Sequence, residues 1–150
     1  MAGQVRITTI VEVWDPVRGY YKWPAQKKTI GSLTAIEDRT YSIASGATRN
    51  VWDPDQVDTE AVSDFNVMVA VPNGTLDMEM DIDQNGTVGR EQNSIRIVKD
   101  LPLCLGSDVA YGNHLTGNAF GGTLDTIDRI RVDEPDSSAK NLRMLLATTA

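Results

Sequence analysis

Oxygen-bearing side chains recur at alternate positions in the stretch DIDQNGTVGREQ, residues 81–92. Asp81, Asp83 and Asn85 have the spacing of the first ligands of a calcium-binding loop. Position twelve, however, is Gln92, where such a loop needs a bidentate glutamate, and the residues before the loop alternate as a strand does. Asn-Gly is also the pair that tight hairpins prefer. We therefore expect a hairpin with a solvated acidic face here, and no metal or other cofactor.

Nucleophilic chemistry has few residues to build on, because the chain has one histidine, His114, and one cysteine, Cys104. A catalytic triad or dyad would have to form around that single histidine. Cys104 lies in the apolar run LPLCL, where nothing electropositive adjoins it to stabilise a thiolate, so we interpret it as a buried, inert thiol. We expect no catalytic residues and rank a small hydrolase as the least favoured alternative.

Aromatic side chains give the stronger signal, and it is a signal for binding. They occur in YYKWP, residues 20–24, and in GSDVAYGNHLTGNAFGG, residues 106–122, which has five glycines in seventeen residues but no phosphate-loop pattern. A loop of this length either folds back on its own domain or acts as a binding arm. The aromatics at 20–24 are suited to stacking on sugar rings or to sealing a subunit contact. The predicted partner-binding residues are Tyr20, Tyr21, Trp23, Tyr111, Leu115 and Phe120.

The charge balance excludes some partners. Fourteen basic and 21 acidic residues give a formal charge of −7, and the basic residues are scattered. A nucleic-acid groove needs clustered Lys and Arg, so we expect no nucleic-acid partner. No apolar run approaches the length of a membrane helix, and the first residues lack the pattern of a classical export signal. We expect a soluble, single domain over residues 1–150.

A period of two dominates the chain, as expected for β-strands with one buried face. It is sharpest in TLDMEMDID, where hydrophobic and acidic residues alternate. FNVMVAV is apolar on both faces and should be a central strand covered on both sides. The segment 33–44 is less regular, and we expect a break near EDR. The expected strands are 4–14, 33–44, 65–71, 75–83, 94–99, 101–105, 123–133 and 140–148.

Helix signals are confined to one short segment, DPDQVDTEAVSD at residues 53–64. Asp53 can cap it and Pro54 suits its first turn, but the segment supports one or two turns only. Many short strands with frequent turns and so little helix predict an all-β, antiparallel β-sandwich, with a jelly roll as the favoured form.

The tetrapeptide VWDP occurs twice, and its flanks disagree, so it does not mark a repeat. In both places Asp-Pro follows an apolar stretch, and proline cannot donate to a ladder. We interpret both as strand ends, with Trp14 and Trp52 closing the ends of the hydrophobic core.

The pattern of TYSIASGATRNVWDP (residues 40–54) and of the closing hairpin IDRIRVDEPDSSAKNLRMLLAT (residues 127–148) resembles the small jelly-roll decoration, or cement, proteins of tailed-phage heads. That resemblance implies a mechanical role on the outside of a virion after synthesis in the host cytoplasm. Oligomers, here a trimer or a dimer, would clamp neighbouring copies of the major capsid protein. It carries over no catalytic residue and no metal. The alternative is a carbohydrate- or receptor-binding module of a virion.

Overall fold

The computed structural model describes residues 3–53, 62, 65–82, 91–106 and 127–149. Within these residues the regular structure consists of strands, with no helix. The helix expected at 53–64 and the glycine-rich loop at 106–122 lie almost wholly outside the described residues. So do Asp83 and Asn85 of the calcium-like loop.

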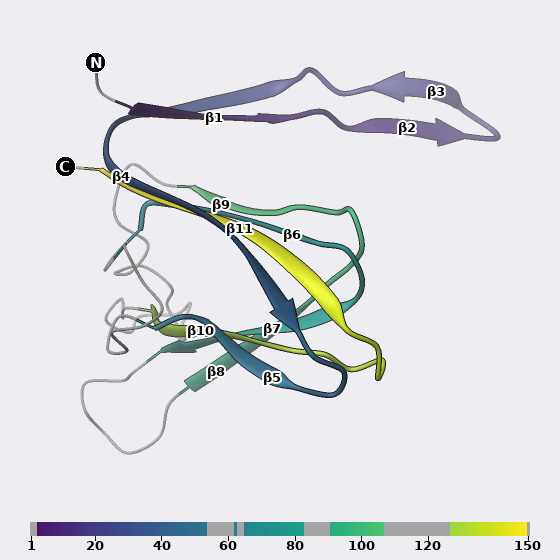
Figure 1. Cartoon of the computed structure of the whole chain (residues 1–150). Coiled ribbons are helices and arrows are strands. Elements are labelled where there is room, and N and C mark those ends of the chain that lie inside the picture. Colours follow the sequence, from purple (N-terminus) through teal and green to yellow (C-terminus); the bar gives the residue numbers. More distant parts are fainter. Residues whose placement is uncertain (1–2, 54–61, 63–64, 83–90, 107–126, 150) are drawn as a thin grey trace.

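The body of the protein is a jelly roll of eight antiparallel strands in two sheets (Figure 1). The strands pair in a nested order, the first with the last and so on inward: β4 with β11, β5 with β10, β6 with β9 and β7 with β8. This nesting confirms the predicted all-β sandwich and defines its jelly-roll topology. The strands are β4 (Gln26–Ile43), β5 (Thr48–Trp52), β6 (Val67–Pro72), β7 (Leu76–Ile82), β8 (Glu91–Ile97), β9 (Leu103–Gly106), β10 (Ile127–Asp133) and β11 (Lys140–Thr149).

The main core lies between the sheet β4-β11-β6-β9 and the sheet β5-β10-β7-β8. Alternation supplies it: Met78 on β7 and Leu142 on β11 are fully buried, while their chain neighbours face outward. Trp52 packs edge-on against Phe65, with ring centroids 5.1 Å apart. Its indole Nε1–H donates to the carbonyl oxygen of Val62 at 2.9 Å. Trp52 therefore closes the core as predicted, and its N–H group is bonded to a buried residue.

The strand β4 is continuous, so the break predicted near EDR is wrong. Each charged residue of that stretch has a partner that keeps it in the strand. Glu37 forms an ion pair with Arg39, and Asp38 accepts two hydrogen bonds from Arg143 on β11, at 3.0 and 2.6 Å. One pair within β4 and one pair across to β11 thus satisfy the charges without a turn.

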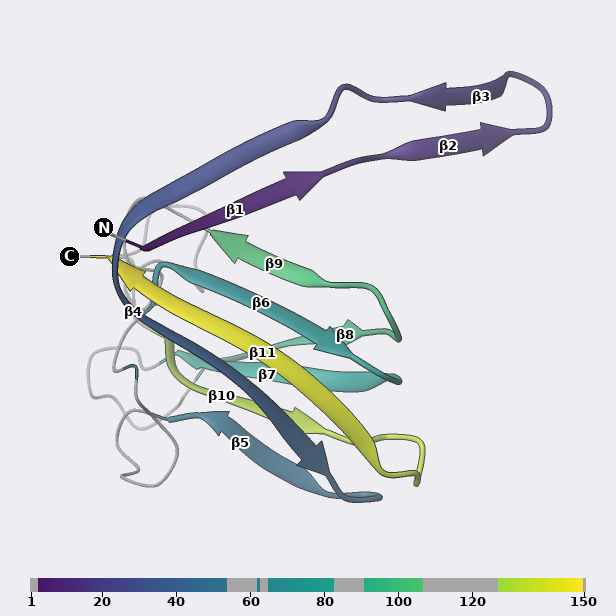
Figure 2. The ribbon, with the colours of Figure 1, turned by 45° about the horizontal axis from the view of Figure 1, so that its top comes forward.

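The first half of β4 leaves the jelly roll and pairs with β1 (Gly3–Thr9) in a two-stranded ribbon. The pairing register shifts near Gly31 and Ser32, and Ser32 has a positive φ of 57°. Such a bulge bends a strand sharply. The ribbon consequently folds over the outer face of the sheet formed by β11, β6 and β9, and lies above it in Figures 1 and 2.

A second apolar cluster holds the ribbon at this corner. Ile30 and Leu33 of β4 are buried against Val67 of β6 and Ala147 of β11, which face away from the main core. Val5 and Ile7 of β1 and Val69 and Leu145 of the sheet pack around them. The ribbon is thus a third layer above the sandwich, fixed at one end.

The ribbon continues into a hairpin that projects beyond the jelly roll, formed by β2 (Glu12–Asp15) and β3 (Gly19–Lys22). We call residues 10–25 the arm. At its tip Asp15 Oδ1 accepts hydrogen bonds from the N–H groups of Val17 and Arg18, and Gly19 supplies the positive φ of 81°. The single strand predicted at 4–14 is therefore two strands, interrupted after Thr9.

Candidate functional site

The arm carries most of the exposed apolar surface. Among the described residues, eleven large hydrophobic side chains are exposed, and seven of them lie between positions 10 and 23. Because β2 and β3 pair only with each other, nothing in the chain's own sheets covers them. A concentration of this kind marks a surface that binds something. The seven are Ile10, Val11, Trp14, Val17, Tyr20, Tyr21 and Trp23.

One face of the arm combines aromatic rings with charge. Trp14 lies opposite Tyr20, and Glu12 lies opposite Lys22. Lys22 Nζ is 2.9 Å from Glu12 Oε1, and this bond lowers the pKa of the Glu12 carboxyl. The Tyr20 hydroxyl also donates to Glu12, which raises the pKa of Tyr20. The Tyr20 ring is thereby held in place by a polar neighbour on the same face.

The opposite face of the arm is apolar. Val13 lies opposite Tyr21, and the N–H of Trp23 donates to the carbonyl oxygen of Val11 at 3.0 Å, which continues the same register. Strand alternation places Val11 and Trp23 on the side of Val13 and Tyr21. Glu12 and Lys22 point to the other side, so the one charged strand residue on this face is Asp15, whose carboxylate is bonded to the turn at the tip.

A groove of about 420 Å³ lies between the ribbon and the outer face of the sheet. Its roof is β1, and its floor comes from β4, β6, β9 and β11 with the residue before β9. An ion pair between Asp38 and Arg143 stands in the lining, and its hydrogen bonds lower the pKa of Asp38. The remaining lining is mainly apolar. The lining residues are Val5, Arg6, Ile7, Thr8, Asp38, Val69, Val71, Pro102, Cys104, Arg143 and Leu145.

Cys104 lies in this groove, and the prediction that it is buried is wrong, because the side chain is exposed. The alternation of β9 explains the error: Leu103 and Leu105 pack on the main core, so Cys104 points to the outer face. Partial burial in the groove raises the pKa of its thiol. The thiol is therefore protonated at neutral pH.

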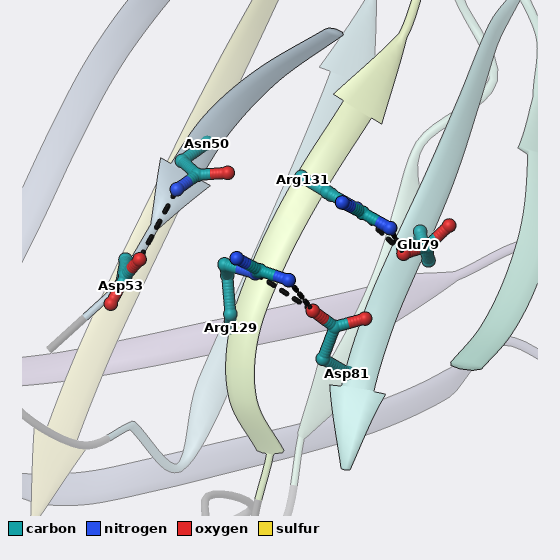
Figure 3. A network of polar contacts seen from close by, with 6 residues as sticks. All are labelled: Asn50, Asp53, Glu79, Asp81, Arg129 and Arg131. Atoms are coloured by element: carbon teal, nitrogen blue, oxygen red, sulfur yellow. Dashed lines mark hydrogen bonds and ion pairs between the residues drawn. The ribbon is translucent and has the colours of Figure 1, made fainter. Parts of the chain in front are cut away.

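The start of the calcium-like loop is engaged in an ion pair (Figure 3). Asp81 is fully buried, and its Oδ2 accepts a hydrogen bond from Arg129 Nε at 2.7 Å. Burial raises the pKa of Asp81, but the hydrogen bonds from Arg129 and the charges of Arg129 and Arg131 outweigh it, so the pKa is lowered. Within the described residues no group of three or more potential ligands is placed to hold a metal ion.

A second, polar hollow of about 410 Å³ lies on the outer face of the other sheet. Its charges are paired across strands, as expected for a solvated face. Arg131 donates to Glu79 at 2.6 Å, and Thr48 donates to Asp133 at 2.7 Å. Figure 3 shows the first of these pairs beside the contact of Asn50 with Asp53, 3.1 Å long. These paired side chains stabilise the sheet.

The structure gathers three of the predicted binding residues, Tyr20, Tyr21 and Trp23, on the arm. The prediction that Trp14 closes the core is wrong, since its side chain is 66% exposed and lies beside Tyr20. A signal for this existed, because a turn sequence, DPVRG, separates two apolar, alternating stretches. The other predicted residues, Tyr111, Leu115 and Phe120, together with His114, lie outside the described residues.

Comparison of the chain with protein-family models, with curated proteins and with solved structures found no match. In the part of the chain that the structure describes, no helix has the length and apolar character needed to cross a membrane.

Proposed function

We propose that this protein is a non-enzymatic structural protein that binds and stabilises the outer surface of an assembled viral capsid. Its partners are the major capsid protein and further copies of itself. The single observation that supports this proposal best is the projecting arm, which holds seven of the eleven exposed large hydrophobic side chains among the described residues.

The arm has the physical features of an anchoring element. Aromatic side chains dominate the energetics of protein interfaces, and each anchored ring contributes about 1–3 kcal/mol. A symmetric oligomer presents several arms at once, so weak single contacts add up through effective concentration. Trp14 and Tyr20 are the anchors that we assign to the shell. The acidic body keeps the protein soluble and away from packaged nucleic acid.

The jelly roll is compatible with this role, since the architecture is common among viral capsid domains and lectins. Fold alone does not imply function, so this is an analogy and the arm carries the argument. Lectin-like binding is the competing proposal, because Trp14 and Tyr20 with the adjacent Glu12 and Lys22 are also suited to stacking on a sugar ring and bonding its hydroxyls.

The test compares binding of the purified protein to capsids stripped of it and to an array of glycans. We expect saturable binding to the capsids that falls at least tenfold in a Trp14→Ala, Tyr20→Ala double variant. The matched control is Val98→Ala, Leu101→Ala, which removes two exposed apolar side chains from the body and should bind as the wild type does. Glycan binding without capsid binding would overturn the proposal in favour of the lectin-like alternative.

A further inference from the structure

We infer that the groove between the ribbon and the sheet is the seat for the arm of a second copy of this chain. The inference rests on the self-association included in the proposed function and deepens it, because it names the two surfaces that meet. It does not depend on capsid binding.

The groove is shaped so that an element from another molecule can be inserted into it. The ribbon is packed on the sheet at the corner near Leu33 and diverges from β6, β9 and β11 towards the arm (Figure 1). Val5 and Ile7 form the roof, and Val69 and Leu145 belong to the floor. The volume of about 420 Å³ lies in the range of pockets that enclose a small ligand, so it has room for aromatic side chains.

The chain's own arm does not fill this groove. The arm is the continuation of the roof strand β1 and of β4, and it extends past the end of the sheet (Figure 2). Its exposed side chains are thus uncovered in a single copy, while the groove beside it is open. An arm from another copy, seated in the groove, buries its own exposed side chains and covers the groove in a single contact.

The distribution of charge selects a second copy as the occupant. Residues 1–30, which form the ribbon strand β1, the arm and the start of β4, contain five basic and two acidic side chains, a net charge of +3. Residues 31–150 contain nine basic and nineteen acidic side chains, a net charge of −10. The arm itself is neutral, with Glu12 and Asp15 against Arg18 and Lys22, so the excess basic charge lies in the ribbon at its base, in Arg6, Lys27 and Lys28. The ribbon of one copy is therefore attracted to the acidic body of its neighbour, although each whole chain carries −7.

The chemistry of the two surfaces matches as well. The face of the arm with Tyr21 and Trp23 is apolar, as is most of the groove, and the one ion pair in the lining, Asp38 with Arg143, is internally neutralised. Burial of such a face against such a groove leaves the pair of Asp38 with Arg143 intact, and Arg6 on the roof strand is the one other charged residue of the lining. The hydroxyl of tyrosine and the indole N–H of tryptophan are suited to a site with an apolar floor and a polar rim.

The native Cys104 provides the probe for this contact, because it is the only cysteine in the chain and lies in the groove. A Tyr21→Cys variant places a second thiol on the arm, where the side chain is exposed. Two controls accompany it. Ser94→Cys places the new thiol on the opposite sheet, and Tyr21→Cys, Cys104→Ser removes the probe from the groove. Circular dichroism and thermal melts confirm that each variant is folded.

After mild oxidation at micromolar concentration, without capsids, we expect the Tyr21→Cys variant to run as covalent dimers on a non-reducing denaturing gel. Peptide mass spectrometry should identify a disulfide between positions 21 and 104. The Ser94→Cys control should stay at the mass of one chain, and the Cys104→Ser control should lose the 21–104 link. A 21–104 link formed within one chain, or links between two copies of position 21 alone, would overturn the inference.

Sedimentation of the wild type separates this inference from the proposed function. A monomer at micromolar concentration contradicts the inference whatever the capsid assay shows. An oligomer without the 21–104 link shows that copies associate through other surfaces, and also contradicts it. If the link forms but stripped capsids are not bound, the arm-in-groove contact stands and the proposed capsid function fails.

Discussion

The carboxylate of Glu134 accepts a hydrogen bond from the backbone N–H of Gly46 at 2.9 Å, across 88 positions of sequence. The same carboxylate accepts from the N–H groups of Asp136 and Ser138, at 2.8 and 3.0 Å. One buried side chain thus joins the β4–β5 turn to the β10–β11 loop at one end of the sandwich. Lys140 lies 3.7 Å from it and balances its charge.

Replacing this carboxylate should make stability less sensitive to acid. The hydrogen bond from Gly46, followed by those from Asp136 and Ser138, lowers the pKa of Glu134. The ionised group therefore contributes stability above the pKa of an unfolded glutamate, about 4.3, and that contribution is lost as pH falls through the folded pKa. We expect Glu134→Gln to lower the melting temperature by several degrees at pH 7, with a smaller deficit near pH 3. A difference in melting temperature between wild type and variant that stays constant from pH 7 to pH 3 would contradict this.

The two VWDP tryptophans should differ strongly in how much stability the same substitution costs. Trp52→Phe removes the hydrogen bond to Val62 and leaves a gap beside Phe65, so we expect a loss of about 2–3 kcal/mol in the free energy of unfolding. Trp14→Phe changes an exposed ring on the arm and should cost less than about 0.5 kcal/mol. Urea denaturation measures both. Equal losses would show that the two tryptophans have similar burial.

The buried ion pair on β7 should matter more than the exposed pair on the same strand. Arg129→Met removes the guanidinium from the fully buried Asp81, and we expect a loss of about 3 kcal/mol. Arg96→Met breaks the pair with Asp77, in which the side chains are 61% and 33% exposed, and should cost less than about 1 kcal/mol. Denaturant titrations of the two variants give the comparison, and a reversed order would contradict the assignment.

Calcium should not stabilise the protein, because the first residue of the calcium-like loop already bonds to Arg129. We expect the same melting temperature with millimolar calcium and with a chelator. A rise of several degrees that the chelator reverses, and that Asp81→Ala abolishes, would show a calcium site and overturn this prediction.

The association of copies should weaken as salt is added, because charges separated by more than about 8–10 Å are screened at 0.1–0.15 M. Lys27→Glu reverses a charge at the base of the arm and should weaken association at low salt. Lys99→Glu makes the same change in total charge on the exposed surface of the body and is the matched control. Sedimentation at two salt concentrations tests both. Equal effects of the two variants would indicate that the strength of association depends on total charge alone.

Much of the jelly roll could be predicted, because each strand buries one face, so that hydrophobic and polar residues alternate along its sequence. Leu76, Met78 and Met80 alternate with acidic residues and are all buried, as the pattern indicates. The same alternation does not indicate which element, if any, covers a given face of a strand. Trp14 ends an apolar stretch, as a core residue can, and lies on the arm. Cys104 has apolar neighbours that point to the core, while its own side chain points outward.

The candidate site was only partly predictable for a related reason. YYKWP marked itself by its aromatic content, but the hairpin that pairs Trp14 with Tyr20 depends on a turn whose effect is to lift both strands off the body. The groove depends on the bulge at Ser32, which folds residues distant in sequence over one another. Neither the position of the hairpin nor the groove can be inferred from the alternation of residues within a single strand.

The positive φ of Ser32 has a mechanical consequence. The arm is attached to the body through one bend, so a small rotation there swings the aromatic tip through a wide arc and hardly moves Val5 or Ile7 beside the corner. In the assembly that we propose, a difference in curvature between flat and strongly bent regions would be absorbed at that bend. The contact surfaces at the tip would stay the same, and one sequence would fit neighbours set at different angles.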